Sequence, residues 1–146
     1  MKTLKITFVL LLVATVTFAQ KSPKKQATGK IGEVTATIDY SAPSVKDRVI
    51  WGELVKYDQI WRAGANENTT VSFDKEVKIK GKISPAGKYG FFVIPTNGGE
   101  WTVVLSKKND AWGSKDYSES NDLVRFTVNT KATVENKEEM TFDVIN

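Results

Sequence analysis

Regular alternation of apolar and polar side chains constrains the fold of this chain more than any other feature. Successive side chains of a β-strand point to opposite faces, so a period of two gives a strand one apolar and one polar face. Segments with this pattern, or with apolar residues on both faces, cover residues 34–40, 71–74, 77–82, 90–94, 101–106, 124–128 and 140–144. Turn sequences rich in Gly, Pro and Asn separate several of them. We therefore predict an all-β fold, an antiparallel β-sandwich of seven or more strands.

One segment departs from the period of two. Apolar side chains recur at helical spacing within residues 48–61, at Ile50, Leu54, Tyr57 and Trp61. This spacing predicts one short helix that crosses an open end of the sheets, with its aromatic residues covering the core. Glycine readily ends a helix, so Gly64 marks where this helical region stops.

The N-terminal residues have the composition of a secretory signal peptide. Lys2 and Lys5 precede an apolar run at residues 6–18, and residues 17–19 offer a small-x-small cleavage pattern before Gln20. The run is too short to span a membrane, and no second run of spanning length follows. We expect residues 1–19 to be removed and the protein to be exported to the periplasm or the medium. Residues 20–30 then form a flexible lead-in to a single β-sandwich domain at 31–146.

The residue types that are absent limit the chemistry. The chain has no His and no Cys, which excludes Ser-His-Asp and Cys-His catalysis and the commonest zinc ligands. We recognise no catalytic motif and predict neither a metal nor another cofactor. The chain has 21 Lys+Arg and 17 Asp+Glu. Removal of residues 1–19 would take away two lysines and no acidic residue, which leaves a net charge of about +2. The one dense basic run, residues 21–25, lies in the lead-in, so binding to nucleic acid is disfavoured.

The segment at residues 61–67, Trp-Arg-Ala-Gly-Ala-Asn-Glu, is the first candidate site. Arginine is scarce, and its planar fork suits carboxylate recognition or stacking on a ring. We hypothesise a polar pocket at one end of the sandwich, lined by Tyr40, Arg48, Arg62, Asn66 and Glu67. The alternative is a structural corner, because Gly and Asn tolerate left-handed backbone and Glu67 can pair with Arg62.

The polar loop at residues 109–122 is the second candidate. Its aromatic residues Trp112 and Tyr117 could stack on a sugar ring or contact a protein partner. Its acidic residues could offer oxygen ligands to calcium, but their spacing does not match a calcium-binding loop. The alternative is a solvated loop held by one tryptophan that folds back on the core.

Several short motifs occur together in a fixed order, at residues 40–48, 61–67, 85–89, 101–103 and 112–113. In this order they resemble a secreted bacterial family, domain of unknown function 2911, over about residues 29–130. The resemblance implies an exported, β-sandwich-like domain with no established activity. The family commonly has arginine where this chain has Ala42, so an anion site that depends on that arginine does not carry over.

Three functions from different classes remain open on the sequence. The first is a non-catalytic binding domain of the cell envelope whose partner is an unknown small molecule, a glycan or an envelope protein. The second is a carboxylate-dependent hydrolase of envelope carbohydrate, with Glu67 as the acid and Asp39 or Asp116 as its partner. The third is a structural subunit of an envelope assembly, which would expose an apolar patch.

Overall fold

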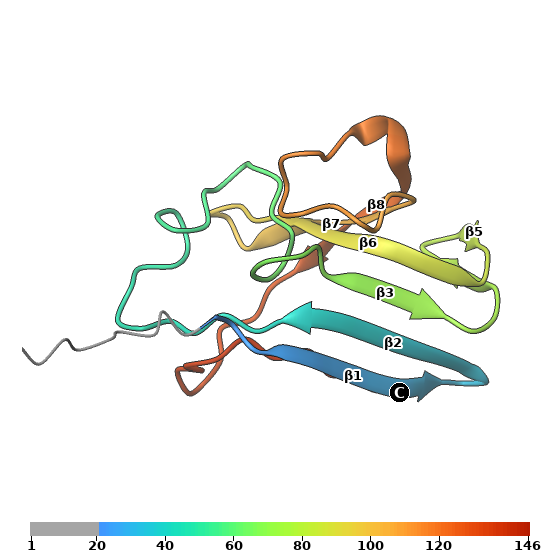
Figure 1. The fold of residues 1–146 in the computed structure, drawn as a ribbon, viewed down its shortest axis with the longest axis horizontal. Coiled ribbons are helices and arrows are strands. Elements are labelled where there is room, and N and C mark those ends of the chain that lie inside the picture. The colour runs from blue at the N-terminus through green and yellow to red at the C-terminus, as the bar shows by residue number, and fades with distance from the viewer. Residues whose placement is uncertain (1–20) are drawn as a thin grey trace, which may run out of the picture.

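The computed structural model describes residues 21–146, in which eight strands form two antiparallel sheets (Figure 1). The larger sheet has the order β1-β2-β3-β6-β7-β8, and β4 and β5 form a separate hairpin. The strands are β1 Lys24–Ile31, β2 Val34–Ser41, β3 Thr70–Phe73, β4 Val77–Ile79, β5 Lys82–Ser84, β6 Gly87–Ile94, β7 Glu100–Ser106 and β8 Asp122–Asn129. The prediction of an all-β antiparallel fold with seven or more strands is confirmed. The predicted signal peptide lies outside the described residues.

One face of the larger sheet carries a hydrophobic cluster. Directly opposed residues of antiparallel strands share a face, and the register sets Val71 against Tyr89 and Leu105 against Val124. These four side chains are buried and form one cluster. Tyr89 also donates from its hydroxyl to the Pro85 carbonyl at 2.6 Å and so anchors the turn before β6.

The C-terminal segment covers part of this apolar face. Residues 140–144 are not a strand, contrary to the prediction, because the segment crosses over the sheet instead of pairing at its edge. The ring of Phe142 packs edge-on against the rings of Tyr40 and Phe91, at centroid distances of 4.9 and 5.6 Å. A Cβ at Gly29 would lie 2.8 Å from the Val144 Cβ, so this glycine permits the close approach.

Strand β1 occupies most of the region for which the sequence predicts a flexible lead-in. It pairs with β2 along its whole length, from Lys24 opposite Ser41 to Ile31 opposite Val34. Its outer face is exposed and therefore polar. Its inner face carries small residues such as Gly29, because the C-terminal segment passes close over it. The lead-in prediction therefore fails from Lys24 onward, and the ordered fold begins before residue 31.

The helix predicted within residues 48–61 is wrong. Turns and isolated bridges replace it, and Gly52 adopts a φ of +85° that interrupts helical backbone. Trp61 instead exchanges two backbone hydrogen bonds with Val93 of β6, at 2.8 and 2.9 Å. The tryptophans still cover the core, since Trp51 packs on Trp61 and on Trp101 at centroid distances of 5.6 and 4.5 Å.

The helical content of residues 21–146 is limited to one 3-10 turn, Glu119–Asn121, in the β7–β8 connection. None of these residues forms a helix long and apolar enough to cross a membrane. In Figure 1 the two longest connections rise from the larger sheet: the β2–β3 connection (residues 42–69, teal to green) and the β7–β8 connection (residues 107–121, orange). These two connections build the site described next.

Candidate functional site

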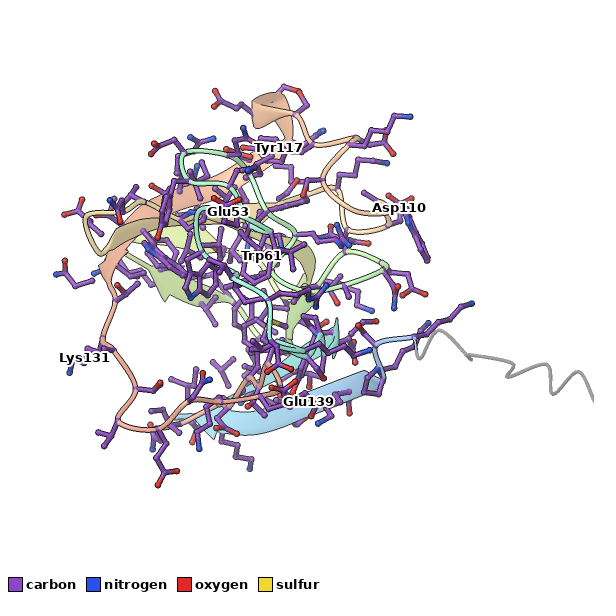
Figure 2. All side chains as sticks on the ribbon, turned by 90° about the vertical axis from the view of Figure 1, so that its left-hand side faces the viewer. Glu53, Trp61, Asp110, Tyr117, Lys131 and Glu139 are labelled. Atoms are coloured by element: carbon purple, nitrogen blue, oxygen red, sulfur yellow. The ribbon has the colours of Figure 1, made fainter. Side chains whose placement is uncertain are left out.

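A polar cleft of about 430 Å³ lies where the β2–β3 and β7–β8 connections meet the larger sheet. We call it the polar cleft. Figure 2 shows Asp110, one of its lining residues, on the same side of the molecule as the N-terminal end of β1, and Lys131 on the opposite side. The lining residues are Lys24, Lys25, Asp39, Tyr40, Ser41, Glu67, Asn68, Thr70, Lys88, Asn109, Asp110 and Ala111.

The floor of the polar cleft follows from strand register. Asp39 of β2 lies opposite Gln26 of β1 and opposite Thr70 of β3, and Thr70 lies opposite Gly90 of β6. Opposed residues share a face, so these residues form one row across four strands. The amide of Gln26 donates to the Asp39 carboxylate at 2.7 Å. Alternation places this row on the face opposite the cluster of Val71 and Tyr89, and the row itself consists of polar residues and glycine.

Two short segments form the wall above this floor. The backbone N–H of Asn68 donates to the Ala111 carbonyl at 3.0 Å, and Glu67 and Trp112 form an antiparallel bridge. The amide of Asn109 donates to the Lys88 carbonyl at 2.8 Å, which ties the wall to β6. The β2–β3 and β7–β8 connections therefore hold each other and are fixed to the sheet.

Gly90 makes room for this arrangement. A Cβ at this position would lie 2.4 Å from the Lys108 carbonyl oxygen and 2.7 Å from Asn68 Oδ1. Real Cβ atoms essentially never approach other heavy atoms below 3.0 Å. The wall can therefore rest on the sheet only because residue 90 has no side chain.

The charged side chains in the lining are paired. Lys24 Nζ lies 2.8 Å from Glu67, and Lys88 Nζ lies 3.4 Å from Asp39. Asp110 forms a salt bridge with Lys108, in which Nζ lies 2.9 Å from the carboxylate. Lys25 forms a salt bridge with Glu139 of the C-terminal segment. No group of three carboxylates in residues 21–146 is placed to hold a metal ion. The polar cleft therefore combines three lining cations with three lining anions, each with a partner.

These ion pairs affect the acidity of the lining carboxyls. The hydrogen bond from Lys24 lowers the pKa of Glu67 below its usual range, with smaller help from the backbone. The hydrogen bond and charge of Lys108 lower the pKa of Asp110 in the same way. Both groups are thus ionised acceptors near neutral pH.

Two neutral oxygens in the lining have no hydrogen-bond partner within the protein. They are Asn68 Oδ1 and Thr70 Oγ1, from residues that are only 6% and 5% exposed. The orientation of the Asn68 amide is fixed, because its Nδ2 donates to the carbonyls of Thr69 at 3.0 Å and Phe91 at 3.4 Å. A flipped amide would set Oδ1 against those two acceptors. The oxygen that Asn68 leaves without a partner is therefore an acceptor, and it packs over Gly90 of β6.

Of the seven residues predicted from sequence, Tyr40 and Glu67 line the polar cleft. The ring of Tyr40 is turned into the core, where its hydroxyl accepts from the Phe142 N–H at 3.3 Å. Asn66 adopts a φ of +57° and donates to the Ser22 carbonyl at 3.4 Å. Arg48 binds the Ser44 and Val45 carbonyls and so stabilises its own turn. These contacts do not bring Arg48 or Asn66 into the lining.

Arg62 lies elsewhere, and its predicted pairing with Glu67 is wrong, since Glu67 pairs with Lys24. A Cβ at Gly113 would lie 3.3 Å from Arg62 Nη1, so the guanidinium packs on the β7–β8 connection. Its Nε is buried without a partner, and burial lowers the pKa of Arg62. Arg62 supports the wall from outside the lining.

The two loop aromatics have different surroundings. Trp112 is 65% exposed, which contradicts the alternative in which it folds back on the core. Tyr117 packs its ring on Phe92 at 5.1 Å and donates to the Asp122 carboxylate at 2.9 Å (Figure 2 labels it near the 3-10 turn). Arg125 in turn donates to the Tyr117 oxygen at 2.7 Å. Tyr117 therefore holds the β7–β8 connection, whereas Trp112 is free to contact other molecules.

The Tyr117 contacts predict a specific loss of stability at alkaline pH. Burial first, and then the bond to Asp122, raises the pKa of Tyr117 to about 12. An unfolded tyrosine has a pKa of about 10, so the unfolded state loses its proton first. The stabilisation is fully present below pH ~10 and is lost as the pH rises from ~10 to ~12, and the whole loss amounts to about 3 kcal/mol.

Tyrosinate absorbance checks this prediction directly. We expect Tyr117→Phe to abolish a phenol ionisation near pH 12, and to flatten the alkaline decline in stability. Asp122→Asn serves as a partial control. It should lower the pKa of Tyr117 only part of the way toward its ordinary value of about 10, because burial contributes more to the upward shift than Asp122 does. An unchanged titration curve for Tyr117→Phe would contradict the assignment.

Sequence patterns alone missed most of the lining, including Lys24, Asn68, Thr70, Lys88 and Asn109. A signal for Thr70 was present, since the alternation of β3 places Thr70 and Ser72 on the face opposite Val71. The contribution of β1 and β6 required the strand order, which alternation does not give.

Comparison with known families gives one match. A family model described as "Protein of unknown function (DUF2911)" matches residues 22–146. A search of curated proteins finds no match, and neither does a search of solved structures.

Proposed function

Since the chain belongs to the DUF2911 family, whose description assigns no activity, we propose a function from the polar cleft itself: non-catalytic binding of a polar ligand. One observation carries this proposal. Two neutral oxygens, on Asn68 and Thr70, are buried in the lining without partners. An unsatisfied buried polar atom costs about 1–3 kcal/mol, so each one in a native protein calls for an explanation, and a bond supplied by a bound molecule is one.

Binding is favoured over hydrolysis by the state of the lining carboxyls. Asp39 and Glu67 line the same cleft, as a hydrolase would require, whereas Asp116 does not. A general acid for glycoside cleavage needs a raised pKa, so that it holds its proton near neutral pH. Lys24 lowers the pKa of Glu67 instead. Glu67 is therefore suited to accepting hydrogen bonds and not to donating a proton.

We place this binding domain in the cell envelope. The support is the leader-like sequence, in which two lysines precede a short apolar run and a small-x-small pattern. Exported proteins without disulfides need stability from packing alone, and the tight fit of Gly29 and Gly90 against neighbouring segments agrees with such packing.

Amide NMR of the purified protein tests the proposal. Panels of neutral saccharides, short peptides and divalent cations are titrated separately. We expect one class to shift, saturably, the amides of residues 67–70 and 109–112, because these backbone groups form the wall of the polar cleft. Residues 131–137, exposed at the far side of the molecule in Figure 2, provide an internal reference that should not move. Saturable shifts confined to other surfaces, or no shifts with any class, would contradict a binding role for the polar cleft.

A further inference from the structure

We propose that the ligand of the polar cleft is a neutral saccharide, with one sugar ring against Trp112 and hydroxyl groups directed to Asn68 and Thr70. This inference rests on the proposed binding function and names its ligand class. Three independent features of the lining lead to it: its charge balance, its unsatisfied atoms and its exposed aromatic.

The charge balance disfavours an ionic ligand. Lining carboxylates and ammonium groups already pair with each other or with nearby Lys108 and Glu139. A charged ligand would have to displace one of these pairs and leave its former partner without a counter-ion. A neutral ligand can accept bonds from the lysines and donate to the carboxylates while the pairs remain in place.

The unsatisfied atoms specify what the ligand must offer. Asn68 Oδ1 is an acceptor whose orientation is fixed by the Thr69 and Phe91 carbonyls, so its partner must be a donor. Thr70 Oγ1 can both donate and accept. A hydroxyl group meets both requirements, since it donates one hydrogen bond and accepts others. Sugars present several such groups on one rigid ring.

Trp112 supplies the apolar surface that sugar recognition also needs. It forms an antiparallel bridge with Glu67, so the two side chains project to the same face of that ribbon. Glu67 lines the polar cleft, and the exposed indole therefore lies at its mouth. The C–H face of a pyranose ring can cover this indole and remove apolar area from water.

The size of the polar cleft agrees with a small ligand. Its volume of about 430 Å³ falls within the range of about 300–1,000 Å³ that is usual for small-molecule sites. The lining comes from four strands and two connections, and hydrogen bonds tie these connections to each other and to β6. The backbone of the site is therefore preformed, but Asn68 Oδ1 and Thr70 Oγ1 are themselves buried, so the wall side chains must shift for a sugar hydroxyl to reach them.

Titration of the purified protein with neutral disaccharides built from glucose, mannose or N-acetylglucosamine, followed by amide NMR, tests this inference. We expect at least one disaccharide to shift the wall amides, with binding weakened about tenfold or more by Trp112→Ala and about tenfold by Thr70→Val. Thr70→Val replaces a hydroxyl that has no partner in the protein, so its Tm should be unchanged or higher. Thr37→Val is the control for binding: Thr37 lies in β2 on the same face of the sheet as Thr70, outside the lining, and this variant should bind as the parent does. Its hydroxyl shares a hydrogen bond with Thr28 at 3.2 Å, so the control applies to affinity and not to Tm.

The other outcomes separate this inference from the function on which it rests. If glutamate, lysine or inorganic phosphate shifts the wall amides and no disaccharide does, the saccharide inference is overturned while the binding function stands. If disaccharides bind equally well to Trp112→Ala and Thr70→Val, the proposed contacts are wrong. If no probe shifts these amides, both the inference and the binding function fail.

Discussion

Gly90→Ala is expected to lower the free energy of unfolding by about 3 kcal/mol, near the upper end of the cost of overpacking. The added methyl would lie 2.4 Å from the Lys108 carbonyl oxygen and 2.7 Å from Asn68 Oδ1. The first of these contacts is with backbone, which cannot rotate away as a side chain can. Either β6 moves, which disturbs its pairing with β3 and β7, or the wall of the polar cleft lifts from the sheet.

Denaturant unfolding measures this loss, and Gly98→Ala is its matched control. Gly98 lies in the exposed turn before β7, and the nearest atom to a Cβ there is Thr96 Oγ1 at 3.9 Å. A change within about 0.5 kcal/mol is expected for this control. Equal stability of the two variants would show that the wall does not rest on residue 90. Chemical shifts of residues 108–111 should also change in Gly90→Ala.

Phe92→Ala should have the largest effect of all, a loss of about 3–5 kcal/mol in the free energy of unfolding. Phe92 is 2% exposed and is among the largest fully buried side chains of the described residues. It lies on the face of β6 opposite the Tyr89 cluster, where it packs on Tyr117. Its removal leaves a cavity beneath the β7–β8 connection as well as losing the burial itself.

Thermal unfolding checks Phe92→Ala against Ile145→Ala, an apolar truncation at a residue that is exposed. The control should be nearly neutral, since its side chain is already in water. A loss below about 1 kcal/mol for Phe92→Ala would mean that the β7–β8 connection does not pack on the sheet. The wall of the polar cleft would then be unsupported.

The strands with strict alternation could be predicted from sequence because one of their faces is buried and the other is in water. β8 meets this condition, because exposed residues alternate with more buried ones along it. β7 is buried on both faces in its second half, yet it coincides with a predicted segment, as do β2 and β3. The alternation also marked residues 140–144, whose side chains do pack on the sheet. Side-chain burial was thus predicted correctly there, while the hydrogen-bonding state of the backbone was not.

Two errors have a common physical origin. The apolar side chains of residues 48–61 cover the core from a series of non-helical turns. Their spacing happens to match that of a helix, and periodicity alone cannot distinguish the two structures. The polar sequence of β1 suggested a flexible lead-in, yet backbone pairing with β2 along its whole length holds this segment in the sheet. In both cases tertiary contacts decided a structure that local pattern did not contain.

The polar cleft could be predicted only in part. Glu67 was identified from an unusual cluster of polar residues, and it lines the cleft. Its partners Lys24, Thr70 and Lys88 come from strands far apart in the chain, and they meet only through the order β1-β2-β3-β6. The fixed orientation of Asn68 depends on two backbone carbonyls. Such geometry cannot be obtained from residue types alone.

The most direct test of this account is a crystal structure of the protein grown with the disaccharide that shifts its wall amides. The account predicts a sugar hydroxyl within about 3 Å of Asn68 Oδ1, a second near Thr70 Oγ1, and a ring against the indole of Trp112. A disaccharide bound elsewhere, with both oxygens bonded to other groups of the protein, would contradict it.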